Sequence, residues 1–252
     1  MKKLLTAAVL TGMIGAAAQA DFLRVEMGGG AWMQEPSGTM SYEDEGWKGA
    51  DTIRKDDTTK AYAWLLIKHP VPIVPNLRLE YTGISSESDT TVQTVVGPPV
   101  TTLTTTQFDA TEYDAILYYN LLDNTFWMTL DLGIDIRMFD YTYDVTPVAG
   151  TYDGYKSKDS FIVPMGYLRT RVEVPATDIG FEADIKYIGN GDTQIYDARI
   201  KVDYTLDFVP VVQPALEVGY RIQKLDIDEK DTDNVNVDIE FSGIYAGLML
   251  RF

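Results

Sequence analysis

Hydrophobic and polar residues alternate along most of this chain with a period of two. In the segment 127–138, WMTLDLGIDIRM, every even position from Met128 to Met138 is apolar, whereas Asp131, Asp135 and Arg137 occupy odd positions. Successive side chains of a β-strand point to opposite faces, so this segment predicts a strand with one apolar and one polar face. A helix would scatter the two aspartates among the apolar residues and fits the pattern poorly.

Ten segments show the alternation and are predicted to be strands: 22–34, 59–68, 76–85, 105–119, 125–142, 160–173, 179–189, 194–206, 214–226 and 237–252. Both faces of 59–68 are apolar, which leaves its orientation open. Short connections alternate with the connections 35–58, 86–104, 143–159, 189–193 and 227–236. In an up-and-down arrangement of ten strands, the short turns and both chain ends therefore lie at one end.

The Thr-rich stretch 90–106, TTVQTVVGPPVTTLTTT, covers most of the connection 86–104 and the first two residues of the strand that follows. Thr and Val favour strands, and Gly-Pro-Pro favours a turn. We expect a hairpin that prolongs the two flanking strands, with a disordered loop as the alternative.

The first twenty residues have the pattern of a secretory signal peptide. Lys2 and Lys3 precede a short apolar run that ends in Ala18-Gln19-Ala20, so cleavage is expected after residue 20. A membrane anchor is the alternative, but the apolar run is short and rich in Gly and Ala. The predicted domains are thus a signal peptide, 1–20, and one mature domain, 21–252.

Composition narrows the classes of partner. The chain has no Cys and a formal net charge of −17, which becomes −19 once the two leader lysines are removed. No disulfide framework is available, and phosphate would be repelled, so nucleic acid is not an expected partner. After residue 20 no run of 18 apolar residues occurs that could form a transmembrane helix.

Two features favour lipid as the solvent of the apolar faces over a soluble sandwich, which also alternates. The polar faces carry opposite charges two residues apart, as in Arg78 and Glu80, which suits a confined polar interior. Aromatic residues gather near strand ends, where Tyr and Trp prefer the lipid–water boundary: Tyr81, Tyr113, Tyr119, Phe126, Trp127, Tyr141, Tyr143, Phe161, Tyr187, Tyr196, Tyr204 and Tyr220. A sheet that spans a membrane must close on itself, so the predicted fold is all-β, a transmembrane antiparallel up-and-down β-barrel of about ten strands.

The end of the chain, YAGLMLRF, resembles the closing strand of Gram-negative outer-membrane β-barrel proteins. The segments HPVPIVPNLRLEY and VPMGYLR are similar to a family of small, uncharacterised outer-membrane proteins of Proteobacteria and their relatives. The resemblance implies residence in the outer membrane, with its lipid and lipopolysaccharide as neighbours, and no activity. It also implies that the barrel-assembly machinery reads the last strand through Tyr245, Leu248, Leu250 and Phe252.

The polar faces predict a network of paired charges in the lumen of the barrel. Its expected members are Arg24, Glu26, Arg78, Glu80, Asp131, Asp135, Arg137, Arg169, Arg171, Glu182, Asp184, Lys186, Asp197, Arg199, Lys201, Asp203, Glu217 and Arg221. Each carboxylate has a basic neighbour on its own strand, so structural ion pairing explains them without a glycosidase site.

The sequence offers little catalytic chemistry. His69 is the one histidine, and it lies on a short turn, too far from the opposite mouth to act as a base there. No nucleophile, phosphate-loop or zinc motif occurs. The acidic run 226–234 lacks calcium-loop spacing. This run and the run 41–47 are interpreted as solvated loops, with weak divalent-ion bridging to lipopolysaccharide as the alternative. No cofactor, metal or catalytic residue is therefore predicted.

Three functions remain open from the sequence. The first is a non-enzymatic outer-membrane barrel with a structural or surface role. The second is a narrow solute channel lined by the same charges. The third is adhesion or ligand binding through the acidic and Thr-rich loops.

Overall fold

The computed structural model describes residues 23–44, 47–53, 57–71, 73–94, 101–125, 127–149, 153–190, 193–206, 212–227 and 235–252. The predicted signal peptide lies outside these residues. So do most of the acidic run 226–234 and part of the run 41–47.

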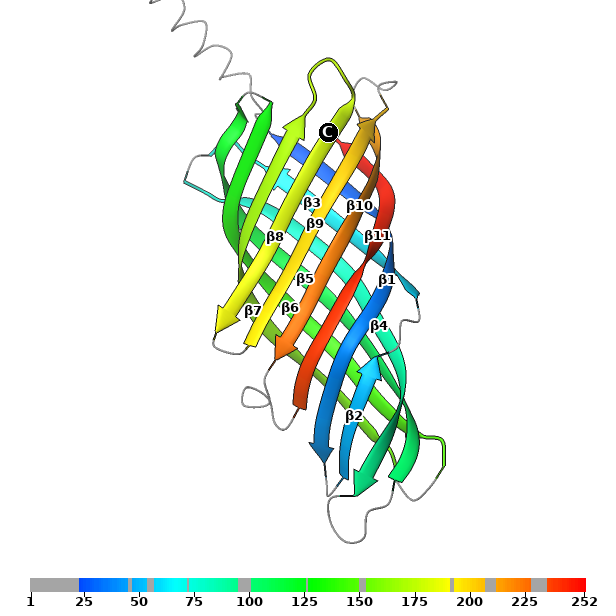
Figure 1. Cartoon of the computed structure of the whole chain (residues 1–252). Coiled ribbons are helices and arrows are strands. Elements are labelled where there is room, and N and C mark those ends of the chain that lie inside the picture. Colours follow the sequence, from blue (N-terminus) through cyan, green and yellow to red (C-terminus); the bar gives the residue numbers. More distant parts are fainter. Residues whose placement is uncertain are drawn as a thin grey trace, which may run out of the picture.

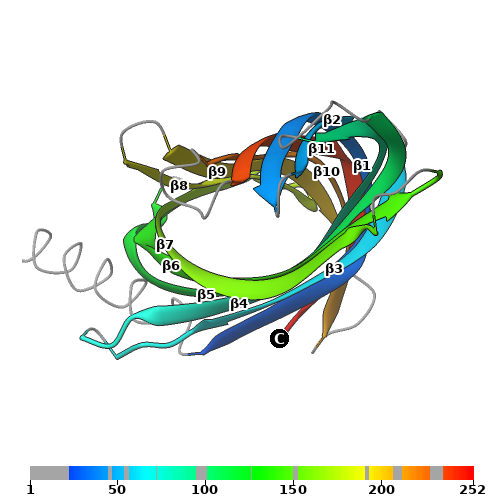
Figure 2. The same cartoon turned by 90° about the horizontal axis from the view of Figure 1, so that it is seen from below.

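The described chain is all-β, and its strands form one antiparallel sheet that closes into a barrel (Figures 1 and 2). The strands are β1 (Arg24–Asp44), β2 (Trp47–Ile53), β3 (Thr58–Lys68), β4 (Asn76–Thr94), β5 (Thr101–Thr125), β6 (Met128–Pro147), β7 (Tyr155–Glu173), β8 (Ile179–Asn190), β9 (Thr193–Thr205), β10 (Gln213–Ile227) and β11 (Val235–Arg251).

Ten ring positions carry these eleven strands. β2 and β3 both pair with β1 on one side and with β4 on the other, so together they fill a single position. Pairing of β1 with β11 closes the ring, with Ala31 opposite Ala246, and the Phe252 amide donates to the Val25 carbonyl at 2.9 Å. The predicted ten-position barrel and its closure by the first and last strands are confirmed. Among the described residues, no helix is long and apolar enough to cross a membrane.

We call the end of the barrel that carries the β3–β4, β5–β6, β7–β8 and β9–β10 connections the turn end. The first residues of β1 and the last of β11 also lie there, as predicted. At the opposite end, β1, β2, β4 and β5 run well beyond β8 and β9 (Figure 1). We call this part the extension; it comprises the described residues of 34–53, 84–111, 139–161, 223–227 and 235–242.

The extension overturns part of the predicted loop boundaries. Residues 35–44 and 47–53 are strand, as are 143–147 and 155–159, although they were expected to be loops. The predicted hairpin over the Thr-rich stretch is confirmed in its described part, because β4 pairs with β5 as far as Gln93 and Thr101. Residues 95–100 lie outside the described chain.

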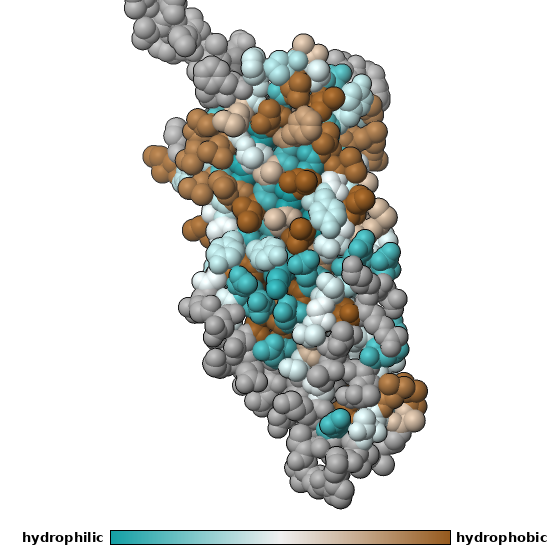
Figure 3. Space-filling model, in the orientation of Figure 1, coloured by the Kyte–Doolittle hydropathy of each residue, from teal (hydrophilic) through white to brown (hydrophobic). Residues whose placement is uncertain are grey.

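On β6 and β11, both faces of the sheet change polarity where the extension begins. On β6 the outward side chains are apolar from Met128 to Met138 and polar from Asp140 to Thr146, whereas the inward ones are polar as far as Arg137 and then mostly apolar from Phe139 to Val145. β11 repeats the change: Ile244 and Leu248 point outward in the barrel body, whereas Asp238 and Glu240 point outward in the extension. On the face shown in Figure 3, hydrophobic residues gather toward the turn end and hydrophilic ones toward the extension.

The inward face of the extension forms a hydrophobic core. Phe108 lies between Phe139 and Phe241, with ring centroids 6.4 Å from each, and Ile84 and Ile239 are almost wholly buried beside them. These residues come from β4, β5 and β6 on one side and β11 on the other. The extension is therefore packed like a small soluble β-sandwich, on the same strands that form the barrel body.

Gln34 bridges a gap in the wall where β2 gives way to β3. Its side-chain Nε2 donates to the Gly83 carbonyl at 2.7 Å, and its Oε1 accepts from the Ser85 amide at 3.3 Å. The Gln34 amide group thus makes the same two hydrogen bonds, one donated and one accepted, that a peptide group of a neighbouring strand would make with β4. The Thr58 hydroxyl adds a bond to the Ser85 carbonyl at 3.2 Å, so side chains replace the sheet ladder at this point.

Candidate functional site

All eighteen charged residues predicted for the lumen lie on the inner face of the barrel body. Sixteen of them are buried, and Arg24 and Arg199 are partly buried. The barrel brings them together in one continuous network of ion pairs. A buried charge is tolerated only when it is paired and hydrogen-bonded. Pairs that reach across the ring fill the lumen, whereas pairs that stay along the wall would leave it open.

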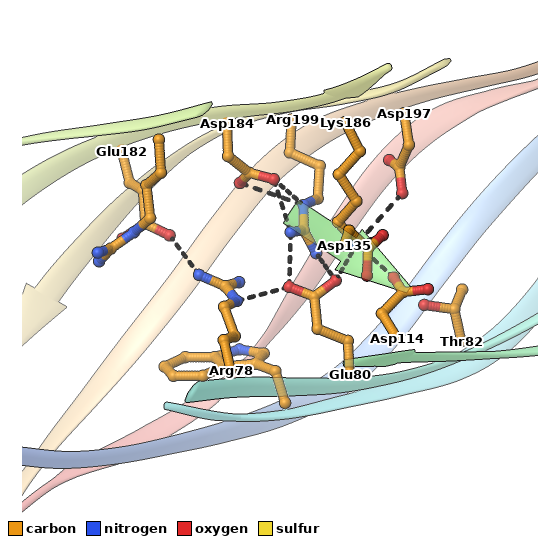
Figure 4. A network of polar contacts seen from close by, with 12 residues as sticks. Arg78, Glu80, Thr82, Asp114, Asp135, Glu182, Asp184, Lys186, Asp197 and Arg199 are labelled. Atoms are coloured by element: carbon orange, nitrogen blue, oxygen red, sulfur yellow. Dashed lines mark hydrogen bonds and ion pairs between the residues drawn. The ribbon is translucent and has the colours of Figure 1, made fainter. Parts of the chain in front are cut away.

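The centre of the network joins opposite walls (Figure 4). Arg199 on β9 donates to both oxygens of Glu80 on β4, at 2.7 and 3.0 Å, and these two strands lie on opposite sides of the ring. Arg199 also binds Asp184 at 2.6 Å. Lys186 on β8 reaches both Glu80 and Asp114 on β5. The side chains at this level therefore cross the whole lumen.

The layer next to the extension is organised by two arginines. Arg137 makes a bidentate contact to Asp114, at 2.6 and 2.9 Å, and donates to Glu112 at 3.1 Å and Asp197 at 2.6 Å. Arg221 on β10 binds both oxygens of Asp197, at 2.8 and 2.6 Å, and lies 3.4 Å from Glu112 across the ring. Arg137 thus links three strands, and Arg221, which also donates to the Thr82 hydroxyl on β4 at 2.9 Å, links four.

The layer at the turn end ties the two ends of the chain to the middle strands. Arg171 on β7 makes a bidentate contact to Asp203 on β9, at 2.8 and 2.9 Å. Arg251, one residue before the end, also binds Asp203 and lies 3.3 Å from Glu26 on β1. Arg24 donates to Glu26 at 2.7 Å. The ion pairs therefore fasten the β1–β11 closure from inside.

Between these layers, Glu182 is the shared partner. Its oxygens lie 2.6 Å from Arg169 and 3.3 Å from Arg78, while Arg169 also donates to Asp131 at 2.7 Å. Strands β4, β6, β7 and β8 are joined by these bonds. The network is continuous from the turn end to the extension.

Aromatic side chains complete the wall around Glu217. Its carboxylate accepts from the Tyr62 hydroxyl at 2.8 Å, the Trp64 indole at 3.1 Å and Lys201 at 3.0 Å. Lys201 also lies over the Trp64 ring, 4.6 Å from its centroid, a favourable cation–π geometry. The cavity that these residues and Trp32 line has a volume of about 20 Å³, room for about one water molecule.

Pairing along a single strand, expected from the sequence, holds only in part. Arg78 binds Glu80 at 2.5 Å, as predicted, but Asp184 pairs with Arg199 on the next strand instead of with Lys186. Inside a closed ring, the side chains of neighbouring and opposite walls are as near as those two residues along the same strand. Most partners therefore come from other strands.

Asp135 is the one predicted member whose carboxylate lacks a hydrogen bond among the described residues. The expected pair with Arg137 is absent, because that guanidinium is directed to β5 and β9. The cross-strand neighbours of Asp135 are Ile116 and Met165, which offer no donor. Its nearest cation is Lys186, at 4.0 Å.

Sequence reasoning missed several residues of the network. Glu112 and Asp114 alternate with Tyr113 within a predicted strand, so the same period-two rule could have found them. Arg251 alternates with the apolar residues of the last strand in the same way. Tyr62 and Trp64 carried no such signal, because both faces of 59–68 look apolar.

The predicted assembly signal lies on two faces. Leu248, Leu250 and Phe252 point outward, with Leu248 62% exposed, whereas Tyr245 points inward and packs edge-on against Tyr62 at 5.4 Å. That the barrel-assembly machinery reads these four residues during insertion stays a prediction.

The predicted aromatic boundary also needs correction. Seven of its residues are exposed: Tyr81, Tyr113, Tyr119, Trp127, Tyr187, Tyr204 and Tyr220. Tyr143 is buried, and Tyr141 and Phe161 pack against the core of the extension. These three residues belong to the extension, where the inward side chains of β6 are apolar. Phe126 lies outside the described residues.

No arrangement typical of a catalytic or metal centre occurs in the described part of the chain. His69 lies in the β3–β4 turn, where its Nε2 is 3.1 Å from the Pro75 carbonyl and its Nδ1 accepts from the Val71 amide at 3.2 Å. Both ring nitrogens thus serve the turn. No group of three or more acidic or histidine side chains is placed to hold a metal ion among the described residues.

Comparison with known proteins gives likenesses of fold only. No family model and no curated protein matches the sequence. The chain is similar to the solved structure of the outer membrane protease OmpT from Escherichia coli, at 12% identity and a TM-score of 0.47, over 93% of this chain and 97% of that one. It is also similar to the outer membrane protein OprG from Pseudomonas aeruginosa (10% identity, TM-score 0.41, 92% and 97%) and to Neisserial surface protein A (12%, 0.34, 92% and 99%). At these levels no activity can be carried over to this chain.

Proposed function

We propose that this chain is an integral β-barrel of the Gram-negative outer membrane, with a sealed lumen and a non-enzymatic, structural or surface role. The observation that carries the proposal is the change of the outward face from apolar to polar at one level, accompanied on β6 and β11 by the opposite change on the inward face. In a soluble sandwich, apolar side chains that point outward over half the length of the strands would be exposed to water, which is unfavourable. A barrel that leaves a bilayer and enters water requires this change on every strand that continues.

The outward apolar rows match the bilayer. On β6 they run from Met128 to Met138, ten residue-to-residue steps of about 3.4 Å each. With a strand tilt of about 40°, this row spans roughly 26 Å along the axis, close to the apolar band of about 25 Å in outer-membrane barrels. Tyr113 and Tyr220 point outward near its extension-side limit, and Trp127 and Phe252 lie at the turn end. We propose that lipopolysaccharide surrounds the first limit and phospholipid the second.

Two barriers support a sealed lumen. The ion pairs of Arg199 with Glu80 and of Arg221 with Glu112 cross the ring, and the aromatic core around Phe108 closes the extension above them. A narrow channel, the second function that the sequence left open, needs a continuous water path through both.

Planar-bilayer conductance tests the proposal. We expect folded protein, verified by its heat-modifiable band on gels, to insert without a steady current. A stable open current from such protein would show that the lumen is wet from end to end and would reject the sealed barrel. The current recorded after urea-unfolded protein is added to the same bilayer is the control for nonspecific leakage.

Surface binding is the second candidate function. It is supported by the extension, whose strands continue beyond the proposed boundary of the bilayer. The outward residues Thr105, Gln107 and Asp109 on β5 are polar, and Leu103 is 49% exposed near the tip. Replacing Leu103 and Thr105 by Ser and Ala should remove adhesion to host or bacterial surfaces and leave the folded band intact. Unchanged adhesion would exclude this face.

A further inference from the structure

The β3–β4 turn, residues 69–75, exposes an unusual apolar tip. Ile73 is 86% exposed, and Val71 and Val74 are 52% and 51% exposed. No acidic, lysine or arginine residue occurs between His69 and Asn76. Turns that face water are normally rich in Gly, Asn, Asp and Ser, and a small cluster of exposed aliphatic side chains indicates an interaction.

Hydrogen bonds connect the described residues of this turn, 69–71 and 73–75, with one another and with Asn76. The His69 amide donates to the Asn76 side-chain oxygen at 3.0 Å, while the His69 ring connects the Val71 amide with the Pro75 carbonyl. The Val74 amide donates to the Val71 carbonyl at 3.3 Å. Because Nδ1 accepts from Val71, Nε2 carries the hydrogen that is donated to Pro75. The aliphatic side chains are thus presented by a fixed backbone.

The turn leans over the outer wall of the barrel. The hydroxyl of Tyr119 on β5 donates to the Ile73 carbonyl at 2.8 Å. Tyr119 points outward, in one row with Leu117 and Leu121, which are 47% and 56% exposed. Figures 1 and 2 both show the β3–β4 turn standing out sideways from the wall near the turn end. The tip is therefore continuous with the outward apolar surface of the barrel body.

We propose that Val71, Ile73 and Val74 form a rigid fin that inserts into the acyl chains of the phospholipid leaflet at the turn end. This inference rests on the membrane location proposed above. The hydroxyl of Tyr119 favours the lipid–water boundary, and its bond to Ile73 fixes the tip at that level. A lipid partner accounts for the uncharged tip and for its sideways direction, whereas a turn that projects into water along the axis would account for neither. The fin would resist rotation and tilting of the barrel.

Spin labelling tests the fin directly, because the chain has no native Cys. Ile73→Cys, Leu248→Cys and Val148→Cys would each be labelled with a nitroxide in phosphatidylethanolamine–phosphatidylglycerol vesicles, after the heat-modifiable band confirms folding. Leu248 lies in the outward apolar row, and Val148, 61% exposed, lies in the extension. We expect collisions with oxygen to dominate at positions 73 and 248, and collisions with a water-soluble nickel complex to dominate at 148. Val74→Cys repeats the measurement within the fin.

The three positions separate the possible failures. Nickel access at 73 and 74 with oxygen access at 248 would overturn the fin and leave the membrane barrel intact. Nickel access at 248 would overturn the membrane barrel and the fin with it. Poor access of both reagents at 73, with spectral broadening from a nearby second label, would show that another copy covers the tip and would also overturn the lipid assignment.

Discussion

Arg137→Met removes the guanidinium that links β6 to β5 and β9. Arg137 is 1% exposed, and its loss takes one partner each from Asp114, Glu112 and Asp197. Each carboxylate keeps another cationic partner, since Lys186 still binds Asp114 and Arg221 binds the other two. Methionine fills most of the volume, so the change tests charge pairing more than packing.

Removing one partner from a buried ion pair costs about 3–5 kcal/mol when the remaining charge is left without compensation. Because each of the three carboxylates keeps another cation, we expect a loss at the lower end of this range, about 3 kcal/mol. With a urea dependence of about 2 kcal/mol per molar, the unfolding midpoint should fall by roughly 1.5 M. Tryptophan fluorescence in vesicles, together with the folded band on unheated gels, measures this shift.

Lys156→Met is the matched control, because it breaks an ion pair on the outside of the extension. Lys156 lies 2.6 Å from Asp144 but is 67% exposed, so its loss should cost less than about 1 kcal/mol. The hydrogen bond from Lys156 lowers the pKa of Asp144 below its usual 3.8. The small contribution of this pair is therefore present at pH 7 and disappears as the pH falls through the lowered pKa. If Arg137→Met shifts the midpoint no more than Lys156→Met does, the lumen network does not brace the barrel.

Two further predictions use pairs of matched positions. On β6, Ile134→Lys should cost about 2–4 kcal/mol as a charge in the bilayer, whereas Thr142→Lys, outward in the extension, should cost less than about 0.5 kcal/mol; equal costs at the two positions would contradict the proposed bilayer boundary. On the inner wall, a Cβ at Gly28 would lie 2.6 Å from the Trp64 ring, so Gly28→Ala should cost about 1–3 kcal/mol through overpacking. Gly166 lies on the outward face of β7, and a Cβ there meets nothing nearer than 3.7 Å. Gly166→Ala should be neutral in the same urea titration, which would reveal any general effect of a Gly→Ala substitution.

Period two predicted the strands and their two faces, and the paired charges, the aromatic residues and the need to close a spanning sheet then predicted the barrel. The alternation placed Arg78, Glu182 and Asp197 on the inner face from sequence alone. It could not pair them, since the partner of Arg199 depends on which strand lies opposite, and that follows from the number, tilt and stagger of the strands.

The extension was missed although its signal was present. On β11 the apolar residues are odd-numbered from Val237 to Phe241 and even-numbered from Ile244 onward. Such a change of phase indicates either a β-bulge or a point where the environment of the outward face changes from lipid to water. Only the second explanation fits an uninterrupted strand. Tyr143 was placed at the lipid boundary because the extension was not recognised. An inward tyrosine is unfavourable in the lumen of a membrane barrel, whereas it is normal in the core of a sandwich.

The core of the extension has a consequence for the order of assembly. Its two layers come from early and late parts of the chain, with Ile84 and Phe108 on one side and Ile239 and Phe241 on the other. The extension cannot become compact until the last strand has docked against the first. During biogenesis, resistance of this part to an added protease should therefore appear in the same step as ring closure, and a trapped, half-zipped intermediate should be cut there while its earlier hairpins are already protected.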